Sequence, residues 1–212
     1  MSRIGILTPM ANGTVEDELR HLLPRPYAVA RLVSPSEDSA ARLVDYAEQA
    51  DRTLAQFGGM PLAAIGFACT ASSYLIGAAR EAELAARFDI PFVFAARAIA
   101  DEMARHGARR IAVISPYPPA IHDAGLGYWT AAGFELIHTA RVDIGSADTR
   151  RIYDLSGCEA APLVAAARGA RPDLILLSGT GMPTRALLAP DADIPVISSN
   201  HCLAQALIRM VS

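Results

Sequence analysis

The feature that most constrains the fold is an internal repeat, because three apolar segments of the first half recur in the same order in the second half. The offsets between matched residues are 107, 110 and 104 positions. Nearly constant spacing of ordered matches predicts two similar lobes related by a pseudo-twofold axis, with the carboxyl ends of their strands facing a shared cleft. The matched segments are Arg3-Ile-Gly-Ile-Leu-Thr-Pro with Arg110-Ile-Ala-Val-Ile-Ser-Pro, Leu62-Ala-Ala-Ile-Gly-Phe-Ala-Cys-Thr with Asp173-Leu-Ile-Leu-Leu-Ser-Gly-Thr, and Asp89-Ile-Pro-Phe-Val with Asp193-Ile-Pro-Val-Ile.

Strand and helix periodicities alternate along the chain, with short loops that carry Gly or Pro. This alternation predicts an α/β fold with mainly parallel sheets and right-handed crossovers. We expect a first lobe over residues 1–98, completed by the C-terminal helix 199–212, and a second lobe over residues 99–198. The predicted strands are 4–7, 27–32, 62–67, 91–94, 111–114, 135–139 and 174–177, and the other predicted helices are 14–23, 37–57, 75–88, 98–106, 125–132 and 158–167.

The composition excludes several classes of protein. With 212 residues the chain can bury a large core, and its net charge of −3 gives no electrostatic reason to bind nucleic acid or an anionic membrane. No apolar run approaches the roughly 18 residues of a membrane span, and the amino terminus has no signal-peptide pattern. We therefore expect a reduced cytoplasmic protein, with a homodimer or higher homo-oligomer as the default assembly.

Cys69 stands where a strand gives way to a helix. The run 62–67 lacks polar alternation, as a central parallel strand does, and Thr70, Ser72 and Ser73 are candidate N-caps of the next helix. At such a helix start, unpaired N–H groups and the helix dipole lower a thiol pKa and hold anions. The alternative is an inert core cysteine, which is the commoner fate of a lone cysteine with apolar neighbours.

Other motifs indicate little chemistry. Cys202 follows His201, but adjacent helical residues point about 100° apart and do not face each other. Cys158 lies at a helix start, where we expect a structural role, and the acidic run 16–18 falls in the first turn of a helix, where it complements the dipole. The sequence has no phosphate-binding loop and no metal-ligand spacing, so we expect neither a cofactor nor a metal.

Four motifs together resemble a known superfamily. They are Thr8-Pro-Met-Ala-Asn-Gly-Thr-Val-Glu16, Cys69-Thr70, Ser115-Pro-Tyr117 and Ser198-Ser-Asn-His-Cys-Leu-Ala204. The chain looks like a member of the aspartate/glutamate racemase superfamily, and within it is similar to maleate cis-trans isomerases and arylmalonate decarboxylases. Isomerases of this group carry a second cysteine at the position of Gly179, whereas the decarboxylases keep that second cysteine and have Gly at the first. This chain has the reverse of the decarboxylase pattern.

The resemblance implies roles for individual residues in a site that needs no cofactor. Asn12 and Tyr117 match residues that bind a substrate carboxylate; the alternatives are a helix N-cap for Asn12 and a surface position for Tyr117. Thr70, Ala71 and Ser72 would form one carboxylate nest at their helix start. Gly179, Thr180 and Gly181, in the loop 178–184, would form its mirror image, while Ser198, Ser199 and Asn200 would fix loop backbone.

The implied chemistry passes through an enediolate of a small carboxylate or dicarboxylate, which requires preorganised hydrogen-bond donors. Two mechanisms need only one cysteine. Cys69 thiolate can add to the double bond of a maleate-like substrate and leave after rotation, or Cys69 thiol can protonate the enediolate left by a decarboxylating malonate. The sequence favours the isomerase. A two-base racemase is disfavoured because Gly179 removes one base, and a non-catalytic carboxylate-binding module remains the competing class.

Overall fold

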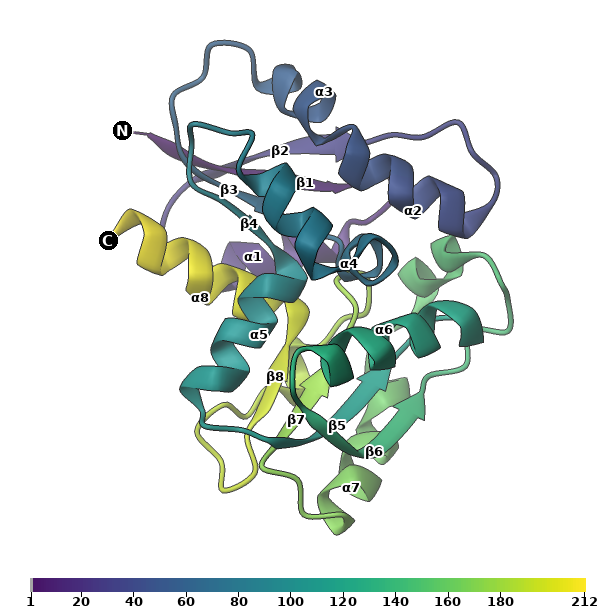
Figure 1. Ribbon diagram of the computed structural model, residues 1–212. Helices are drawn as coiled ribbons and strands as arrows, with labels where there is room; N and C mark the ends of the chain where they lie inside the picture. The colour runs from purple at the N-terminus through teal and green to yellow at the C-terminus, as the bar shows by residue number, and fades with distance from the viewer. Residues whose placement is uncertain (1) are drawn as a thin grey trace.

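The computed structural model describes residues 2–212 and contains two parallel four-stranded sheets, one in each lobe (Figure 1). The first sheet has the strand order β2-β1-β3-β4 and the second has the equivalent order β6-β5-β7-β8. The expected α/β class with two similar lobes is confirmed. The strands are β1 (Arg3–Pro9), β2 (Tyr27–Leu32), β3 (Leu62–Phe67), β4 (Phe92–Phe94), β5 (Arg110–Ser115), β6 (Glu135–Arg141), β7 (Leu174–Leu177) and β8 (Val196–Ser198).

Backbone hydrogen bonds outside the ladders repeat between the lobes. Ala68 N–H donates to the Leu7 carbonyl, and Ser178 N–H donates to that of Ile114, both at 2.8 Å. Likewise Ile65 N–H donates to the Pro91 carbonyl and Ile175 N–H to that of Pro195, again at 2.8 Å. These pairs are separated by the same offsets as the repeated sequence segments. The residues that follow β3 and β7 are therefore structural counterparts.

Helices flank both sheets, and several begin or end away from their predicted limits. They are α1 (Thr14–Leu22), α2 (Ser39–Glu48), α3 (Ala50–Leu54), α4 (Thr70–Ala85), α5 (Ala95–Arg105), α6 (Pro119–Ala131), α7 (Ala161–Gly169) and α8 (Ser199–Val211), with short 3-10 helices η1 (Ala55–Phe57), η2 (Thr149–Asp154), η3 (Cys158–Ala160) and η4 (Arg185–Leu187). No helix within residues 2–212 is long and apolar enough to cross a membrane.

The single helix predicted over 37–57 is wrong. Asp38 caps the start of α2, since its side chain accepts a hydrogen bond from Ala41 N–H at 2.8 Å. The helix then breaks at Gln49, whose backbone leaves the helical region, and α3 and η1 follow as separate short turns. Apolar periodicity continues across the break, which is why the sequence pattern concealed it. The short edge strand β8 was also missing from the predicted strands.

The chain crosses back to the first lobe at its end. The segment after β8 becomes α8, which packs against α1, α5 and β3, whereas β8 itself pairs with β7 in the second sheet. Figure 1 shows this C-terminal helix beside the first lobe. Across the lobes, α4 packs against α6. The carboxyl ends of the central strands of both sheets meet at this junction, where the next residues of interest lie.

Candidate active site

Cys69 lies directly after β3 and is the N-cap residue of α4. It is 4% exposed, and its Sγ accepts a hydrogen bond from Ser72 Oγ at 3.2 Å. Burial raises the pKa of the Cys69 thiol above its ordinary value, although hydrogen bonds from Ser72 and from the Ser72 and Ala71 N–H groups oppose this effect. The N–H groups at the helix start thus lower this pKa as expected, but desolvation outweighs them and the net pKa is raised.

The predicted N-caps of α4 also need correction. Thr70, Ser72 and Ser73 lie inside the helix, and no side chain caps its start. The small hydroxyl residues of the first turn bring α4 close to the second lobe. The Ser72 hydroxyl donates its hydrogen bond to Cys69 Sγ and does not cap the helix backbone.

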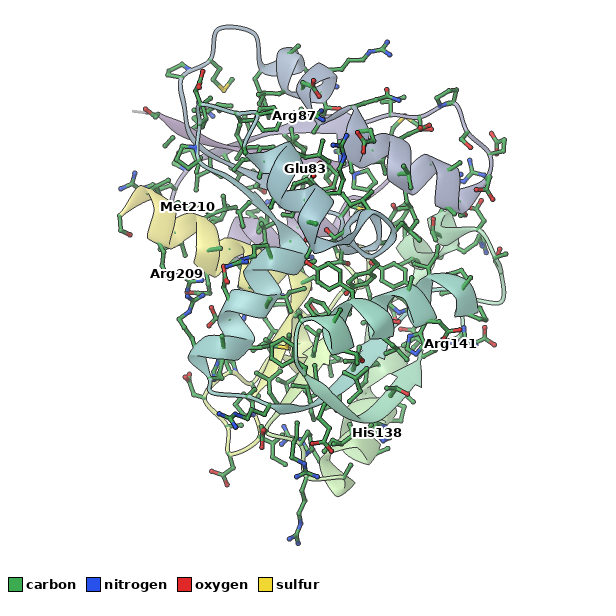
Figure 2. The ribbon with its side chains drawn as sticks, in the orientation of Figure 1. Glu83, Arg87, His138, Arg141, Arg209 and Met210 are labelled. Carbon is green, nitrogen blue, oxygen red and sulfur yellow. The ribbon has the colours of Figure 1, made fainter. Side chains whose placement is uncertain are left out.

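Tyr117 and Thr70 join the two lobes beside Cys69. Their hydroxyl groups share a hydrogen bond of 2.7 Å, and Tyr117 is 5% exposed, so the alternative of a surface tyrosine is wrong. Burial raises the pKa of Tyr117 well above its usual value, and a negative charge on Cys69 would raise it further. The phenol therefore stays protonated and can donate a hydrogen bond. Arg141, the last residue of β6 (Figure 2), holds this loop by donating to the Tyr117 carbonyl at 3.2 Å.

The residues after β7 form the facing wall. Thr180 Oγ1 donates to the Ala68 carbonyl at 2.9 Å and accepts from Asn12 Nδ2 at 3.3 Å. Asn12 is fully buried, and α1 is capped by Gly13, so the N-cap alternative for Asn12 is wrong. Thr14 Oγ1 donates to the Gly181 carbonyl at 2.9 Å. Asn12, Thr70, Tyr117 and Thr180 thus meet at one junction.

Gly179 has a backbone that favours glycine. Its φ is +135°, and a Cβ added there would lie 2.9 Å from Pro116 Cδ and 3.6 Å from the Tyr117 hydroxyl oxygen. Its N–H donates to Ser199 Oγ at 2.9 Å. The facing wall is built from a loop followed by η4, with no α-helix between β7 and β8, so it lacks the helix dipole of its counterpart.

Asn200 and Ser199 hold loop backbone as expected, because Asn200 Nδ2 donates to the Thr180 carbonyl at 3.0 Å and Ser199 Oγ accepts from Gly179 N–H at 2.9 Å. Ser198 instead caps a helix, since its Oγ accepts from His201 N–H at 3.3 Å at the start of α8. Cys202 is buried in α8, and its burial raises the pKa of that thiol well above its ordinary value. Cys158 is exposed at the start of η3.

Sequence reasoning missed Glu18, Tyr46 and Tyr153. Glu18 is buried and accepts hydrogen bonds from Thr184 and Asn200, so it does not simply complement a dipole. Its one sequence signal was its place on the apolar face of α1. Burial raises the pKa values of Tyr46 and Tyr153, and a charge on Cys69 would raise both further. Tyr153 packs against the facing wall, because a Cβ added at Gly181 would lie 2.6 Å from its Cε1. Tyr46 is buried on α2, which packs against α4.

The sequence model of the arylmalonate decarboxylase family matches residues 4–212. The chain belongs to this family. No curated protein sequence matches it. Among residues 2–212 no cluster of three His, Cys, Asp or Glu side chains that could hold a metal ion occurs.

Solved structures of two kinds share the fold of this family member. The maleate isomerase of Pseudomonas putida has a TM-score of 0.85 at 20% identity, covering 98% of this chain and 92% of its own. A serine variant of Nocardia farcinica maleate cis-trans isomerase, with a covalently bound succinylcysteine intermediate, has a TM-score of 0.80 at 22% identity, covering 99% and 92%. A liganded arylmalonate decarboxylase carrying a glycine-to-cysteine and a cysteine-to-serine exchange has a TM-score of 0.77 at 18% identity, covering 100% and 93%.

Proposed function

We propose that the protein is a cofactor-independent enzyme that uses Cys69 to isomerise a small cis-dicarboxylate such as maleate through an enediolate. The observation that carries this proposal is the junction of four neutral hydrogen-bonding side chains, Asn12, Thr70, Tyr117 and Thr180, beside one cysteine at a helix start. Neutral donors held in place by the fold can stabilise charge that develops on a carboxylate. The isomerase relatives of the same fold, one of them with a succinylcysteine intermediate, support the choice.

In this reaction Cys69 first loses its proton to water. The thiolate then forms a C–S bond to one carbon of the double bond, and the π electrons move into the adjacent carboxylate to give the enediolate. The attacked carbon–carbon bond is now single and can rotate. Collapse of the enediolate breaks the C–S bond, releases the thiolate and gives the trans product. No proton donor is required on the wall of Gly179.

Decarboxylation is the second candidate, and the raised pKa of Cys69 favours it. A malonate would lose CO₂, the electrons of the broken bond would form the enediolate, and the Cys69 thiol would donate its proton to the α-carbon before recovering one from water. The liganded decarboxylase variant, in which a glycine is replaced by cysteine and a cysteine by serine, supports this candidate as well. Since Cys69 stands on the wall opposite the usual cysteine of the decarboxylases, we expect a product of opposite handedness.

The test is to incubate the protein separately with maleate and with a 2-aryl-2-methylmalonate, and to follow fumarate and the chiral monoacid by chromatography. Fumarate alone, lost in Cys69→Ser and kept in Cys158→Ser, is the expected result. Monoacid alone would establish the second candidate instead. If neither product forms, neither maleate nor the arylmalonate is the substrate, and the proposal of a maleate isomerase is wrong.

A further inference from the structure

Cys69 is closed off from solvent, so any reaction at its sulfur requires an opening. A cavity of about 180 Å³ is lined by residues of both lobes, among them Arg42, Tyr46, Arg150 and Tyr153. Tyr153 also packs on the facing wall, since a Cβ added at Gly181 would lie 2.6 Å from its Cε1. Gly181 follows Thr180, whose Oγ1 donates to the carbonyl of Ala68, the neighbour of Cys69. The cavity therefore lies next to the wall that faces Cys69.

A set of polar contacts between the lobes borders this cavity. Arg42 Nη2 donates to Asp148 Oδ1 at 2.9 Å, and the Arg42 side chain is only 5% exposed. Ser39 Oγ donates to the Ala147 carbonyl at 3.3 Å and accepts from Thr149 N–H at 3.4 Å. We call these five residues the latch: Ser39, Arg42, Ala147, Asp148 and Thr149.

The latch joins two segments that belong to different lobes. Arg42 also donates to the carbonyls of Ser36 and Glu37, each at 3.1 Å, so it fixes the loop before α2. On the other side, Arg150 donates to Asp148 Oδ2 at 2.7 Å and to Glu37 Oε2 at 3.0 Å. Figure 1 shows the segment that follows β6 reaching the amino-terminal end of α2. Because the lobes are joined here by side chains and a few exposed contacts, this edge can open without breaking either sheet.

The inner contacts between the lobes are different in kind. The Thr180–Ala68 and Glu18–Thr184 hydrogen bonds are fully buried, whereas the side chains of Asp148 and its partner Arg150 are 32% and 48% exposed. The exposed Arg150–Glu37 pair contributes little to stability because water screens it, and each partly buried hydrogen bond of the latch contributes only modestly. The contacts at this edge are therefore the ones that break first. From this arrangement we propose that the latch is the gate to Cys69, and that its opening admits substrate between Tyr46 and Tyr153.

The gate can be tested without knowing the reaction, because the alkylation rate of each of the three free cysteines reports solvent access at a different place in the fold. Cys69 lies behind the latch, Cys158 is exposed, and Cys202 is buried in α8. The rate of alkylation of each thiol by iodoacetamide is measured by peptide mass spectrometry at one pH. We expect Asp148→Asn and Ser39→Ala to accelerate alkylation of Cys69 roughly two- to tenfold, the size expected for loss of weak contacts, with Cys158 and Cys202 unchanged.

Matched variants separate a gate from a general effect of charge or stability. Ser39→Ala changes no charge, so faster alkylation there does not reflect a shift of the Cys69 pKa. Asp148→Glu keeps the carboxylate and should restore most of the slow rate. Asp154→Asn removes a charge from the 3-10 helix that Asp148 caps. Within residues 2–212 Asp154 pairs with Arg151 alone, so this variant should leave Cys69 unchanged.

Two outcomes would overturn the gate. If neither Asp148→Asn nor Ser39→Ala accelerates Cys69, access to the thiol does not pass the latch. If Cys202 accelerates together with Cys69 in both variants, the substitutions loosen the whole protein and no local gate is involved. Since the readout is alkylation and not turnover, failure of this proposal is distinct from failure of the proposed isomerase.

Discussion

At the scale of single residues, the chemistry depends on whether Cys69 works as a thiolate or as a thiol. The start of α4 offers N–H groups that stabilise a thiolate, but complete burial has the larger effect and raises the pKa. At neutral pH the closed protein therefore holds the protonated thiol. The isomerase reaction requires Cys69 as the thiolate, whereas decarboxylation requires it as the thiol. The rates of the two candidate reactions therefore change with pH in opposite directions.

We predict a pH profile of kcat/KM that distinguishes them. A thiolate nucleophile with a raised pKa gives a rate that increases with pH and still climbs above the ordinary thiol pKa of about 8.5. A thiol donor gives a rate that is level through neutral pH and falls only in the alkaline range. The measurement is kcat/KM from about pH 6 to about pH 10 with the substrate that turns over. A midpoint at or below the ordinary thiol value would contradict the raised pKa.

The sequence predicts the site residues at strand ends better than it predicts the residues that pack around them. Cys69, Tyr117 and Thr180 follow strand ends, and strand ends are recognisable because apolar runs stop at small or hydroxyl residues. Arg42 and Tyr153 belong to a helix and a 3-10 helix with no local signature. Their positions depend on how the two lobes pack, which no short segment encodes. The net pKa of Cys69 was unpredictable for the same reason, because burial is a property of the whole fold.

At the scale of elements, α4 is two helical pieces joined at Gly77. Gly77 has φ +79° and ψ 160°, values that break the helix and that only glycine adopts easily. The second piece carries Glu81, which is buried although α4 reaches the surface at Glu83 (Figure 2). Tyr128 of α6 donates a hydrogen bond to Glu81 Oε2, while Oε1 has no partner. Burial raises the pKa of the Glu81 carboxyl.

We predict that Glu81→Gln stabilises the protein at neutral pH. A carboxyl whose folded pKa is raised favours the folded state below its unfolded pKa of about 4.3, and this contribution is lost as the pH rises through the folded value. Gln does not titrate and can still accept from Tyr128, so its advantage should grow from acid to neutral pH, reaching about 1–3 kcal/mol. Urea unfolding at both pH values measures it. Glu83→Gln, at an exposed position paired with Arg80, is the control and should change little; an equal effect there would rule out burial as the cause.

At the scale of the whole molecule, Glu18 binds the two lobes together. Its carboxylate accepts hydrogen bonds from Thr184 Oγ1, from Arg185 N–H at 2.8 Å and from Asn200 Nδ2 at 2.8 Å. Asn200 donates in addition to the Thr180 carbonyl. One side chain of α1 therefore positions the loop of the facing wall, although it lies in the other half of the sequence.

We predict that Glu18→Ala lowers the free energy of unfolding by about 2–5 kcal/mol, because it leaves several buried donors without an acceptor. Turnover should fall as well, since the loop that holds Thr180 loses its anchor. Asp17→Ala is the matched control on the same helix, where Asp17 makes only a 3.8 Å ion pair with Arg20 at the surface. Urea unfolding of both variants measures the change in the free energy of unfolding. A comparable decrease in the two variants would show that Glu18 has no special role between the lobes.

Gly179 also limits how this protein can evolve. A cysteine there would need a positive φ and would press its Cβ against the Pro116 ring, so a single substitution at position 179 is penalised before any chemistry is gained. Replacement of Pro116 would relieve the contact, but that replacement brings no benefit by itself. The two positions are thus epistatic. A second cysteine at position 179 is therefore more accessible after Pro116 has changed than before, and while both residues stay the two repeated halves of the chain have unequal chemistry.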